Sequence, residues 1–396
     1  MPATTTTAPT RRILACVSGM SPAIVTETLF ALVTQQDFIP DEVHVITTLK
    51  GRDRIRTDLL NPDTGPFHAF VREYLPGRSI RFDDDTIHLI GAKDGNTRKD
   101  ITTDDDNRAA ANTLYRVLRE LKSVPGTHLH ASVAGGRKSM SFYMGQAFSL
   151  VAESQDRLSH VLVSDPFENP ALQFFYPPRT PRDFSAADKQ TGQTTLVANS
   201  ANAHVQLADL SVIKLRSMLG EMPARAQRDF DFAIRLAQAT LEPPKVRMVW
   251  STIQQEGRVE MLGETVKMAP QEFLVLGLYA LARLHERELP AGAALRLEEG
   301  DEGLGEVFLH ELSGENLEDL DEPRKTFKPV HSKILTRLRA QVGGASEWLT
   351  IESTGKPPAR CEHRRCALRL PADRLEMVGF DTKWWPLLRA ALVSAG

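Results

Sequence analysis

Residues 11–34 of this 396-residue chain read RRILACVSGMSPAIVTETLFALVT. The first part, Arg11–Ser18, is a short apolar run that predicts a buried strand. Gly19 permits a tight turn, and Pro22–Thr34 then carries apolar side chains at helical spacing. A buried strand that leads directly into a helix is the repeating unit of α/β proteins, so we expect that fold class.

The same alternation continues through the first half of the chain. The pattern predicts further strands at Glu42–Thr48, Thr86–Ile90, His128–Val133 and His160–Ser164. It also predicts helices at Asp104–Leu121 and Lys138–Glu153, and a partly helical segment at Asp58–Tyr74. Strands separated by helices of this length imply a parallel sheet that is covered on both faces. We therefore expect a Rossmann-like domain over residues 11–178.

The second half has a different character. Residues 179–203 are rich in Pro, Thr, Ser, Gln and Asp, which predicts a linker or surface loop. Residues 204–396 predict a mainly helical domain with a small hairpin at Val259–Met268. Helices are expected at Leu207–Leu219, Ala224–Gln238, Pro270–Glu286 and Ser332–Val342, and wing strands at Trp348–Ser353 and Cys366–Leu370. Two helices and a β-wing together predict a winged helix-turn-helix.

Composition excludes several classes of protein. Three cysteines are too few for a disulfide scaffold and suit a reducing compartment. No apolar run reaches the ~18 residues of a membrane span, and the N-terminus lacks the pattern of a signal peptide, so we expect a cytoplasmic protein. The formal net charge of −3 argues against a globally basic nucleic-acid binder.

The first candidate motif, Ser18-Gly19-Met20-Ser21-Pro22, follows the first predicted strand. In open parallel sheets, ligands bind at the carboxyl ends of the strands. We expect Ser21 to cap the next helix and Pro22 to be its first residue, and the free N–H groups of that turn favour an anion. The alternative is that Ser21 does nothing more than cap the helix.

The second candidate motif, Ser132-Val133-Ala134-Gly135-Gly136-Arg137-Lys138-Ser139-Met140, follows the fourth predicted strand. Its two glycines let the backbone approach a ligand. Arg137 and Lys138 place positive charge at a helix N-terminus, where it opposes the helix dipole. This unfavourable placement indicates that the site expects an anion, although a solvated turn with two exposed cations is the alternative.

No common nucleotide fingerprint accompanies these loops. The patterns G-x-G-x-x-G and G-x-x-x-x-G-K-[ST] are both absent at the strand ends, which disfavours a dinucleotide enzyme and an NTPase. No Ser/His/Asp triad or pair of acid–base carboxylates is evident. A cleft with hydroxyls, glycines and two cations instead suits a phosphodiester ligand.

Together, the S-G-M-S-P and A-G-G-R-K-S-M motifs resemble those of the CRISPR-associated Rossmann-fold (CARF) family. The resemblance covers about residues 11–178. It implies a homodimer that binds a cyclic oligoadenylate second messenger of type III CRISPR defence across a two-fold axis. Relatives with a C-terminal winged helix cleave the ligand slowly and are called ring nucleases, whereas others carry a ribonuclease or nuclease effector domain.

The resemblance therefore implies a metal-independent phosphodiesterase with no cofactor, whose products end in a 2′,3′-cyclic phosphate. The expected catalytic residues are Lys138 and Arg137, together with Ser18 and Ser21 of the first loop. Expected ligand contacts are Gly19, Met20, Thr48, Arg52, Ser132, Gly135, Gly136, Ser139 and Met140. Cyclic tetra-adenylate is the favoured ring, because similar winged-helix members bind it and an even-numbered ring suits a two-fold dimer.

Alternative functions remain open at this point. The same pocket could sense the ligand without cleaving it, while the winged helix binds DNA. An ordinary nucleotide-binding enzyme is a third reading. A ribonuclease effector is disfavoured, because Arg324 and His331 lie at the loose limit of the expected Arg–His spacing and Pro329 interrupts the stretch.

Charge is uneven around the predicted recognition helix. Glu298–Glu322 contains eleven acidic residues and no Lys or Arg, and Pro323–Ala340 contains six basic residues and no Asp or Glu. His331, Lys333, Arg337 and Arg339 would lie on that helix. Such cations suit phosphate contacts, but internal neutralisation in a dimer-building domain is the favoured alternative.

Three further features carry weaker hypotheses. Thr47–Arg56, with four cations after the second strand, is either a lid over the site or a solvated loop. Cys361, His363 and Cys366 offer three zinc ligands without an evident fourth, so no metal site is predicted. Trp384 and Trp385 are expected in packing or in a dimer interface.

Overall fold

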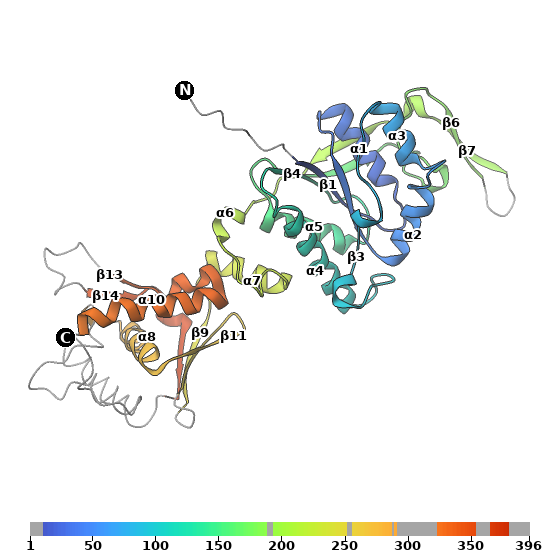
Figure 1. The fold of residues 1–396 in the computed structure, drawn as a ribbon. Helices are drawn as coiled ribbons and strands as arrows, with labels where there is room; N and C mark the ends of the chain where they lie inside the picture. The colour runs from blue at the N-terminus through green and yellow to red at the C-terminus, as the bar shows by residue number, and fades with distance from the viewer. Residues whose placement is uncertain are drawn as a thin grey trace, which may run out of the picture. The chain divides into compact units, whose positions relative to one another are not determined.

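The computed structural model describes residues 11–187, 193–251, 256–286, 289–290, 323–353 and 365–379 (Figure 1). The chain divides into two compact units, Met1–Ser217 and Met218–Gly396. Each unit is described by itself below.

The first unit is built on a six-stranded sheet in the order β3-β2-β1-β4-β5-β8. Its strands are β1 Arg11–Val17, β2 Glu42–Thr47, β3 Ile87–Leu89, β4 Thr127–Ser132, β5 Arg157–Val163 and β8 Val205–Asp209. The first five pair in parallel, and β8 runs antiparallel to β5. The predicted parallel, Rossmann-like sheet is confirmed.

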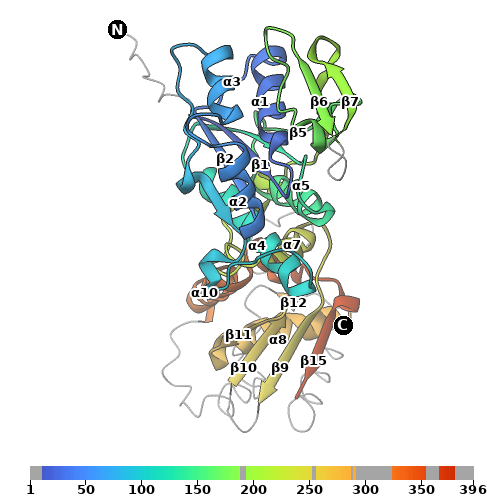
Figure 2. The ribbon, with the colours of Figure 1, turned by 90° about the vertical axis from the view of Figure 1, so that its right-hand side faces the viewer.

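Helices cover both faces of this sheet (Figures 1 and 2). On one face, α1 (Ala23–Gln35) and α3 (Pro66–Tyr74) pack their apolar side chains against those of β1 and β2 in a single buried cluster. On the other face, α4 (Asp104–Leu121) and α5 (Lys138–Val151) pack against each other. Strand residues alternate between the two faces, which explains why every residue of Ile13–Val17 is buried.

Three segments of the first unit differ from the sequence predictions. The residues considered as a lid or loop after β2 form helix α2, Leu49–Asp58. The predicted linker 179–203 contains a hairpin, β6 Asp183–Ala187 with β7 Thr194–Asn199.

The predicted helix Leu207–Leu219 is wrong in its first part, because Leu207 lies in β8. This strand hydrogen-bonds to the exposed edge of β5, and Leu207 packs on the core. Such a long-range pairing overrides local helix propensity. The first compact unit consequently extends to Ser217 instead of ending at residue 178.

The segment that leads out of the first unit is fixed to the end of α5. The Leu215 amide donates to the Ser149 carbonyl oxygen at 2.8 Å, and the Ser149 hydroxyl donates to the Ile213 carbonyl oxygen. The Arg216 guanidinium donates to the carbonyl oxygen of Val151 at 3.2 Å. It also pairs with Glu153 at 3.3 Å, just beyond the last turn of α5.

The second unit contains two sheets, in the orders β11-β10-β9-β15 and β12-β14-β13. Its strands are β9 Val246–Ser251, β10 Glu256–Met261, β11 Glu264–Met268, β12 Leu289–Pro290, β13 Ile351–Ser353, β14 Arg365–Leu368 and β15 Leu375–Val378. Its helices are α7 Phe230–Leu241, α8 Pro270–Leu284 and α10 Pro323–Val342, and α6 Arg216–Leu219 spans the boundary between the units.

Two local predictions for this unit are confirmed. The hairpin of β10 and β11 turns at Gly263, whose φ of 78° is left-handed. The antiparallel pair of β13 and β14 lies where the wing strands are expected. In the described part of the chain, no helix is both long and apolar enough to cross a membrane.

His130 on β4 is a buried group that the fold favours in its neutral form. Its Nε2 lies 2.7 Å from the Ser159 hydroxyl, and burial lowers its pKa to about 4. The unfolded chain binds a proton at its ordinary pKa near 6.5, so folding loses stability as pH falls from about 6.5 to 4.

We predict that His130→Gln removes this pH dependence. Between pH 7 and pH 5 the wild type should lose roughly 1–2 kcal/mol of unfolding free energy that the variant does not lose. Urea denaturation followed by circular dichroism measures both proteins at both pH values. Comparison with the variant is needed because buried Glu27, whose pKa burial raises to about 8, shifts stability in the opposite direction. An identical pH response of the two proteins would contradict the assignment.

Candidate functional site

Three loops at the carboxyl ends of β1, β2 and β4 meet at glycines. A Cβ atom on Gly19 would lie 3.0 Å from the Cα of Gly136, which is tighter than nine in ten such contacts in folded chains. A Cβ atom on Gly51, in the first turn of α2, would lie 1.9 Å from Thr47 Oγ1 and 3.1 Å from the Gly19 carbonyl oxygen. The two motifs are thereby brought together, as expected from their strands.

The second loop needs both of its glycines. Gly135 and Gly136 have φ values of 105° and 70°, a region that side-chain-bearing residues avoid. A Cβ atom on Gly135 would also lie 2.9 Å from the carbonyl oxygen of Val17, the last residue of β1. These glycines therefore fix the approach of α5 to the end of β1.

Ser18 is the buried residue of the first loop. Its amide donates to the Ile46 carbonyl oxygen at 3.2 Å, and its own carbonyl oxygen accepts the Thr47 hydroxyl at 2.7 Å. The Ser18 hydroxyl has no hydrogen-bond partner among the described residues, although it is buried. A buried polar atom left in this state calls for an explanation.

Ser21 differs from its expected structural role. Helix α1 begins at Ala23, its N-cap is Pro22, and no side chain caps it. The interpretation of Ser21 as the N-cap and of Pro22 as the first helical residue is therefore wrong. The Val25 amide closes the first turn by donating to the Pro22 carbonyl oxygen at 3.1 Å. Ser21 is exposed instead, beside Met20, whose side chain is also exposed.

Lys138 is the first residue of α5, and its side chain is exposed. It makes no ion pair or side-chain hydrogen bond with any residue that the structure describes. No acidic residue occupies the first turn of α5. The Lys138 ammonium group therefore lies at the N-terminus of α5 without a partner among the described residues. Lys138 follows Gly135 and Gly136, the glycines that meet the first loop, by only a few residues.

Arg137, in contrast, has an acidic partner. Its guanidinium lies 3.2 Å from Asp100, and Lys50 Nζ lies 3.2 Å from the same carboxylate. The Ile101 amide lowers the pKa of Asp100 most, and hydrogen bonds from Arg137 and Lys50 lower it further. Asp100 therefore stays ionised and shares its charge between the two cations.

The other residues of the second loop that are expected to contact the ligand make hydrogen bonds or packing contacts within the protein. Ser132 is buried, and its hydroxyl lies 3.4 Å from that of Thr28 on α1. The Ser139 hydroxyl donates to Asn107 of α4 at 2.7 Å, and Met140 is buried. These side chains join the helices to the sheet.

Thr48 and Arg52 are located on or beside α2. The Thr48 hydroxyl caps this helix by accepting the Gly51 amide at 3.3 Å. The Arg52 guanidinium pairs with neighbouring Asp53 at 2.9 Å. The four cations after the second strand are therefore displayed on a helix.

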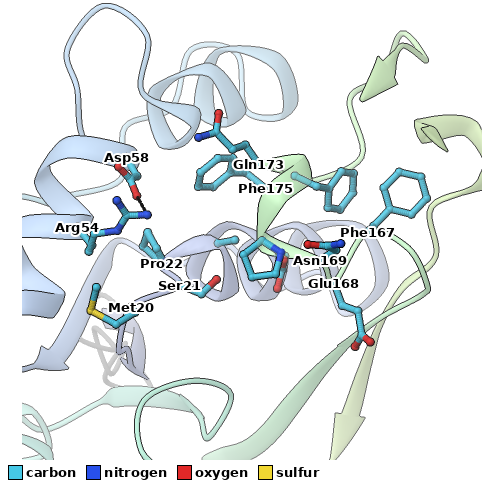
Figure 3. Close-up of a pocket in the computed structure, with 14 residues that line it drawn as sticks. Met20, Ser21, Pro22, Arg54, Asp58, Phe167, Glu168, Asn169, Gln173 and Phe175 are labelled. Atoms are coloured by element: carbon cyan, nitrogen blue, oxygen red, sulfur yellow. Dashed lines mark ion pairs between the residues drawn. The ribbon is translucent and has the colours of Figure 1, made fainter. Parts of the chain in front are cut away.

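A cavity opens beside the first loop (Figure 3). Met20 and Ser21 line it together with α1, α2 and the segment after β5. The residues that line it are Met20, Ser21, Pro22, Ala23, Glu27, Arg54, Asp58, Phe167, Glu168, Asn169, Pro170, Gln173, Phe174 and Phe175. No residue of the second motif lines this cavity.

Glu27 is the residue of this cavity that the sequence interpretation missed. It lies in the second turn of α1 and is only 6% exposed. The available signal was a single acid within the otherwise uncharged helix AIVTETLFALVTQ. A charged residue within a predicted buried helix is unusual unless it is paired.

Two cations of α10, Arg337 and Arg339, have acidic partners inside the second unit. Arg337 pairs with Glu272 at 3.1 Å, and Arg339 pairs with Glu347. The His331 ring accepts the Ile351 amide at 3.3 Å, while Lys333 is exposed. Acids from α8 and from the turn after α10 thus neutralise both arginines of the described part of this helix.

Several hypotheses concern residues outside the described part of the chain. These are the acidic run 298–322, the side chain of Arg324, Cys361, His363, the side chain of Cys366, and Trp384 with Trp385. Among the residues that the structure does describe, no group of three His, Cys, Asp or Glu side chains is arranged to hold a metal ion.

Residues 21–243 match the model of a protein family described as CRISPR-associated protein NE0113. No curated protein matches the chain. Among solved structures, Enterococcus italicus Csm6 bound to cyclic hexa-2′-fluoro-hexa-dAMP matches with a TM-score of 0.29 and 13% identity. That match covers 59% of this chain and 50% of the Csm6 chain, so the present chain spans about half of its length.

The glycine contacts predict an unusual response at Gly51. Alanine normally stabilises a helix by about 1 kcal/mol relative to glycine. Gly51→Ala should instead destabilise the protein by about 1–3 kcal/mol, because its Cβ overlaps Thr47. The matched control is Gly145→Ala in α5, where a Cβ atom would meet its nearest neighbour at 3.9 Å. Thermal denaturation should rank Gly145→Ala at or above wild type and Gly51→Ala below it, and the reverse order would contradict the contact.

Proposed function

The chain belongs to the CRISPR-associated protein NE0113 family, and we propose that its first unit binds a cyclic oligoadenylate and cleaves it to linear products. The ring opens without a metal ion, because the ligand supplies its own nucleophile. Cleavage would end the signal that the cyclic messenger carries.

The unpaired Lys138 ammonium is the observation that carries this proposal. It lies at a helix N-terminus, two residues after Gly136, where the backbone meets Gly19 of the serine-containing loop. A cation and free helix N–H groups both favour a phosphate oxygen. The structure gives Lys138 no acidic partner in the described part of the chain, so its charge is available to a ligand.

The ion pairs of Asp100 support a role for Arg137 in binding the phosphate. The carboxylate holds both Arg137 and Lys50 at 3.2 Å on the surface. Exposed ion pairs contribute less than about 1 kcal/mol, so a phosphodiester can displace this carboxylate at little cost. Arg137 would then bind phosphate oxygens through two parallel N–H groups.

The reaction follows from these positions. The ribose 2′-oxygen of the ligand attacks the adjacent phosphorus, and the bond from phosphorus to the 5′-oxygen breaks. One product end is a 2′,3′-cyclic phosphate and the other is a 5′-hydroxyl, which receives the proton released from the 2′-hydroxyl. Lys138 stabilises the charge that develops on the phosphoryl and leaving oxygens. Exposed Ser21 orients the phosphate for in-line attack, and buried Ser18 holds the loop in place through its backbone hydrogen bonds to Ile46 and Thr47.

Slow turnover is expected from this arrangement. The proposed catalytic residues that reach the ligand are a lysine, an arginine and a serine, and none of them is a strong base at neutral pH. The rate enhancement then comes from positioning and electrostatic stabilisation.

For the second unit we propose a winged-helix domain that builds the homodimer. Helices α8 and α10 and the three-stranded sheet β12-β14-β13 support this architecture. The internal pairing of Arg337 and Arg339 favours dimer building over DNA binding. A two-fold dimer presents two equal phosphate sites, which suits cyclic tetra-adenylate.

The test is incubation of wild type and Lys138→Ala with cyclic tetra-adenylate and cyclic hexa-adenylate in EDTA, followed by mass analysis. We expect linear products with a 2′,3′-cyclic phosphate, and a rate reduced about 100-fold or more in the variant, because loss of one such electrostatic contact typically costs this much. Lys245→Ala, at an exposed lysine of the second unit, is the control and should cleave like wild type.

Two other outcomes would redirect the proposal. Tight binding of an intact ring would favour the sensing regulator, and a steep salt dependence of DNA retention would then support DNA binding by the second unit. Products that form equally fast with Lys138→Ala would remove this lysine from the mechanism.

A further inference from the structure

A serine of α5 contacts the glycine loop from the side of the helix. Ser141 lies one turn after Lys138, and its hydroxyl donates to the carbonyl oxygen of Val133 at 2.8 Å. The carbonyl oxygen of Gly135 lies 3.3 Å from the same hydroxyl. These two carbonyl groups of the loop after β4 therefore point toward Ser141.

The direction of the Gly135 carbonyl group fixes the direction of the next amide. In a trans peptide bond the C=O and N–H groups point to opposite sides, and the bond between Gly135 and Gly136 is trans. The Gly136 N–H group therefore points away from Ser141. The Gly136 nitrogen lies close to the first loop, since a Cβ atom on Gly19 would lie 3.4 Å from it.

The Gly136 N–H group is available to a ligand. It makes no hydrogen bond with any residue that the structure describes, and Gly136 is exposed. The amides of Lys138 and Ser139, in the first turn of α5, also lack a partner within the described ranges. Neighbouring N–H groups of this kind favour an anion.

Two consecutive glycines do not keep such an orientation by themselves. Glycine adopts positive and negative φ about equally well, so the peptide group between Gly135 and Gly136 can turn over unless its carbonyl oxygen is held. After such a flip the carbonyl oxygen, instead of the N–H group, would face a bound phosphate and repel it. The Ser141 hydroxyl opposes this flip.

We propose that Ser141 is a positioning residue, whose hydroxyl keeps the Gly136 N–H group directed at one phosphate oxygen of the ligand. The inference rests on the proposed function, which supplies the phosphate. Ser141 does not contact the ligand, because its hydroxyl proton is engaged by the carbonyl oxygens of the loop. Its role also differs from that of Lys138, since an ammonium group attracts both non-bridging oxygens, whereas one fixed N–H group distinguishes between them.

The experiment uses this stereochemical difference. Either non-bridging oxygen of a phosphate can be replaced by sulfur, a weaker hydrogen-bond acceptor, which gives rings whose phosphorothioates are all Rp or all Sp. Cyclic tetra- and hexa-2′-deoxyadenylate lack the attacking hydroxyl and stay intact, so calorimetry measures their Kd values. For the wild type we expect the Kd values of the two isomers to differ about tenfold, because hydrogen bonds to charged groups are strong.

Substitution of the serine should remove this difference. Ser141→Ala should bind the unmodified ring about tenfold more weakly and bring the isomer ratio below about twofold, since the N–H group is no longer directed at one oxygen. A general loss of stability would affect both isomers equally and leave their ratio unchanged. Ser141→Thr keeps the hydroxyl and should keep the wild-type ratio.

The matched control is Ser149→Ala. It removes a hydroxyl-to-carbonyl hydrogen bond from the other end of the same helix, where the Ser149 hydroxyl donates to Ile213. This variant should keep both the affinity and the isomer ratio of the wild type. Circular dichroism shows that each variant compared is folded.

The failures are distinguishable. If the wild type binds neither unmodified ring, the proposed function is overturned and the role of Ser141 with it. If a ring binds but the wild-type isomer ratio is close to one, or if folded Ser141→Ala keeps the wild-type ratio, the role of Ser141 alone is overturned. A ring that binds without being cleaved overturns the cleavage reaction, while the isomer ratio still decides the role of Ser141.

Discussion

The direct contact between the backbones at Gly19 and Gly136 is the constraint on which the candidate site depends. Two neighbouring parallel strands, β1 and β4, end at the same edge of the sheet, and their loops would normally be separated by side chains. Glycine at both positions allows the loops to touch. Because α5 starts two residues after this contact, the contact fixes where the Lys138 ammonium is held. The adjacent Gly51 extends the same packing to α2, so three helices begin around one point.

Charge is distributed differently around α10 and around the glycine contact, and the difference supports the proposed phosphate site. On α10, Arg337 and Arg339 have acidic partners, and one of these, Glu272, is itself buried. Around the glycine contact, one aspartate serves both Arg137 and Lys50, and Lys138 has no partner in the described part of the chain. Pairing of the first kind leaves little net charge on the described face of the helix. An excess of positive charge at a helix N-terminus contributes nothing to the fold by itself and is understandable where an anion binds.

The sequence predicts the first unit well where local pattern and topology agree. The parallel sheet and the meeting of its two loops can be predicted from the sequence. The signals are the apolar runs, the helical spacing and the glycines that follow β1 and β4. They do not suffice for β8, because this strand forms by pairing with the distant edge of β5. They also miss the buried acid Glu27 in the cavity lining, since spacing shows that its helix is buried but not which neighbours surround the acid. Ser21 was assigned as the cap because serine is a favoured N-cap residue, whereas the helix begins at Ala23 with Pro22 as its N-cap.

Helix α5 connects two places that are far apart in the sequence. Its first residue is Lys138, and its last turn holds the segment 213–216 through Ser149 and Val151, with a further ion pair from Glu153 just beyond the helix. A helix of 14 residues is stiff over its length of roughly 21 Å. The proposed phosphate site and the attachment of the connecting segment therefore lie at opposite ends of one helix. A phosphate bound at Lys138 would rest on the same rigid element that holds the chain before it enters the second unit.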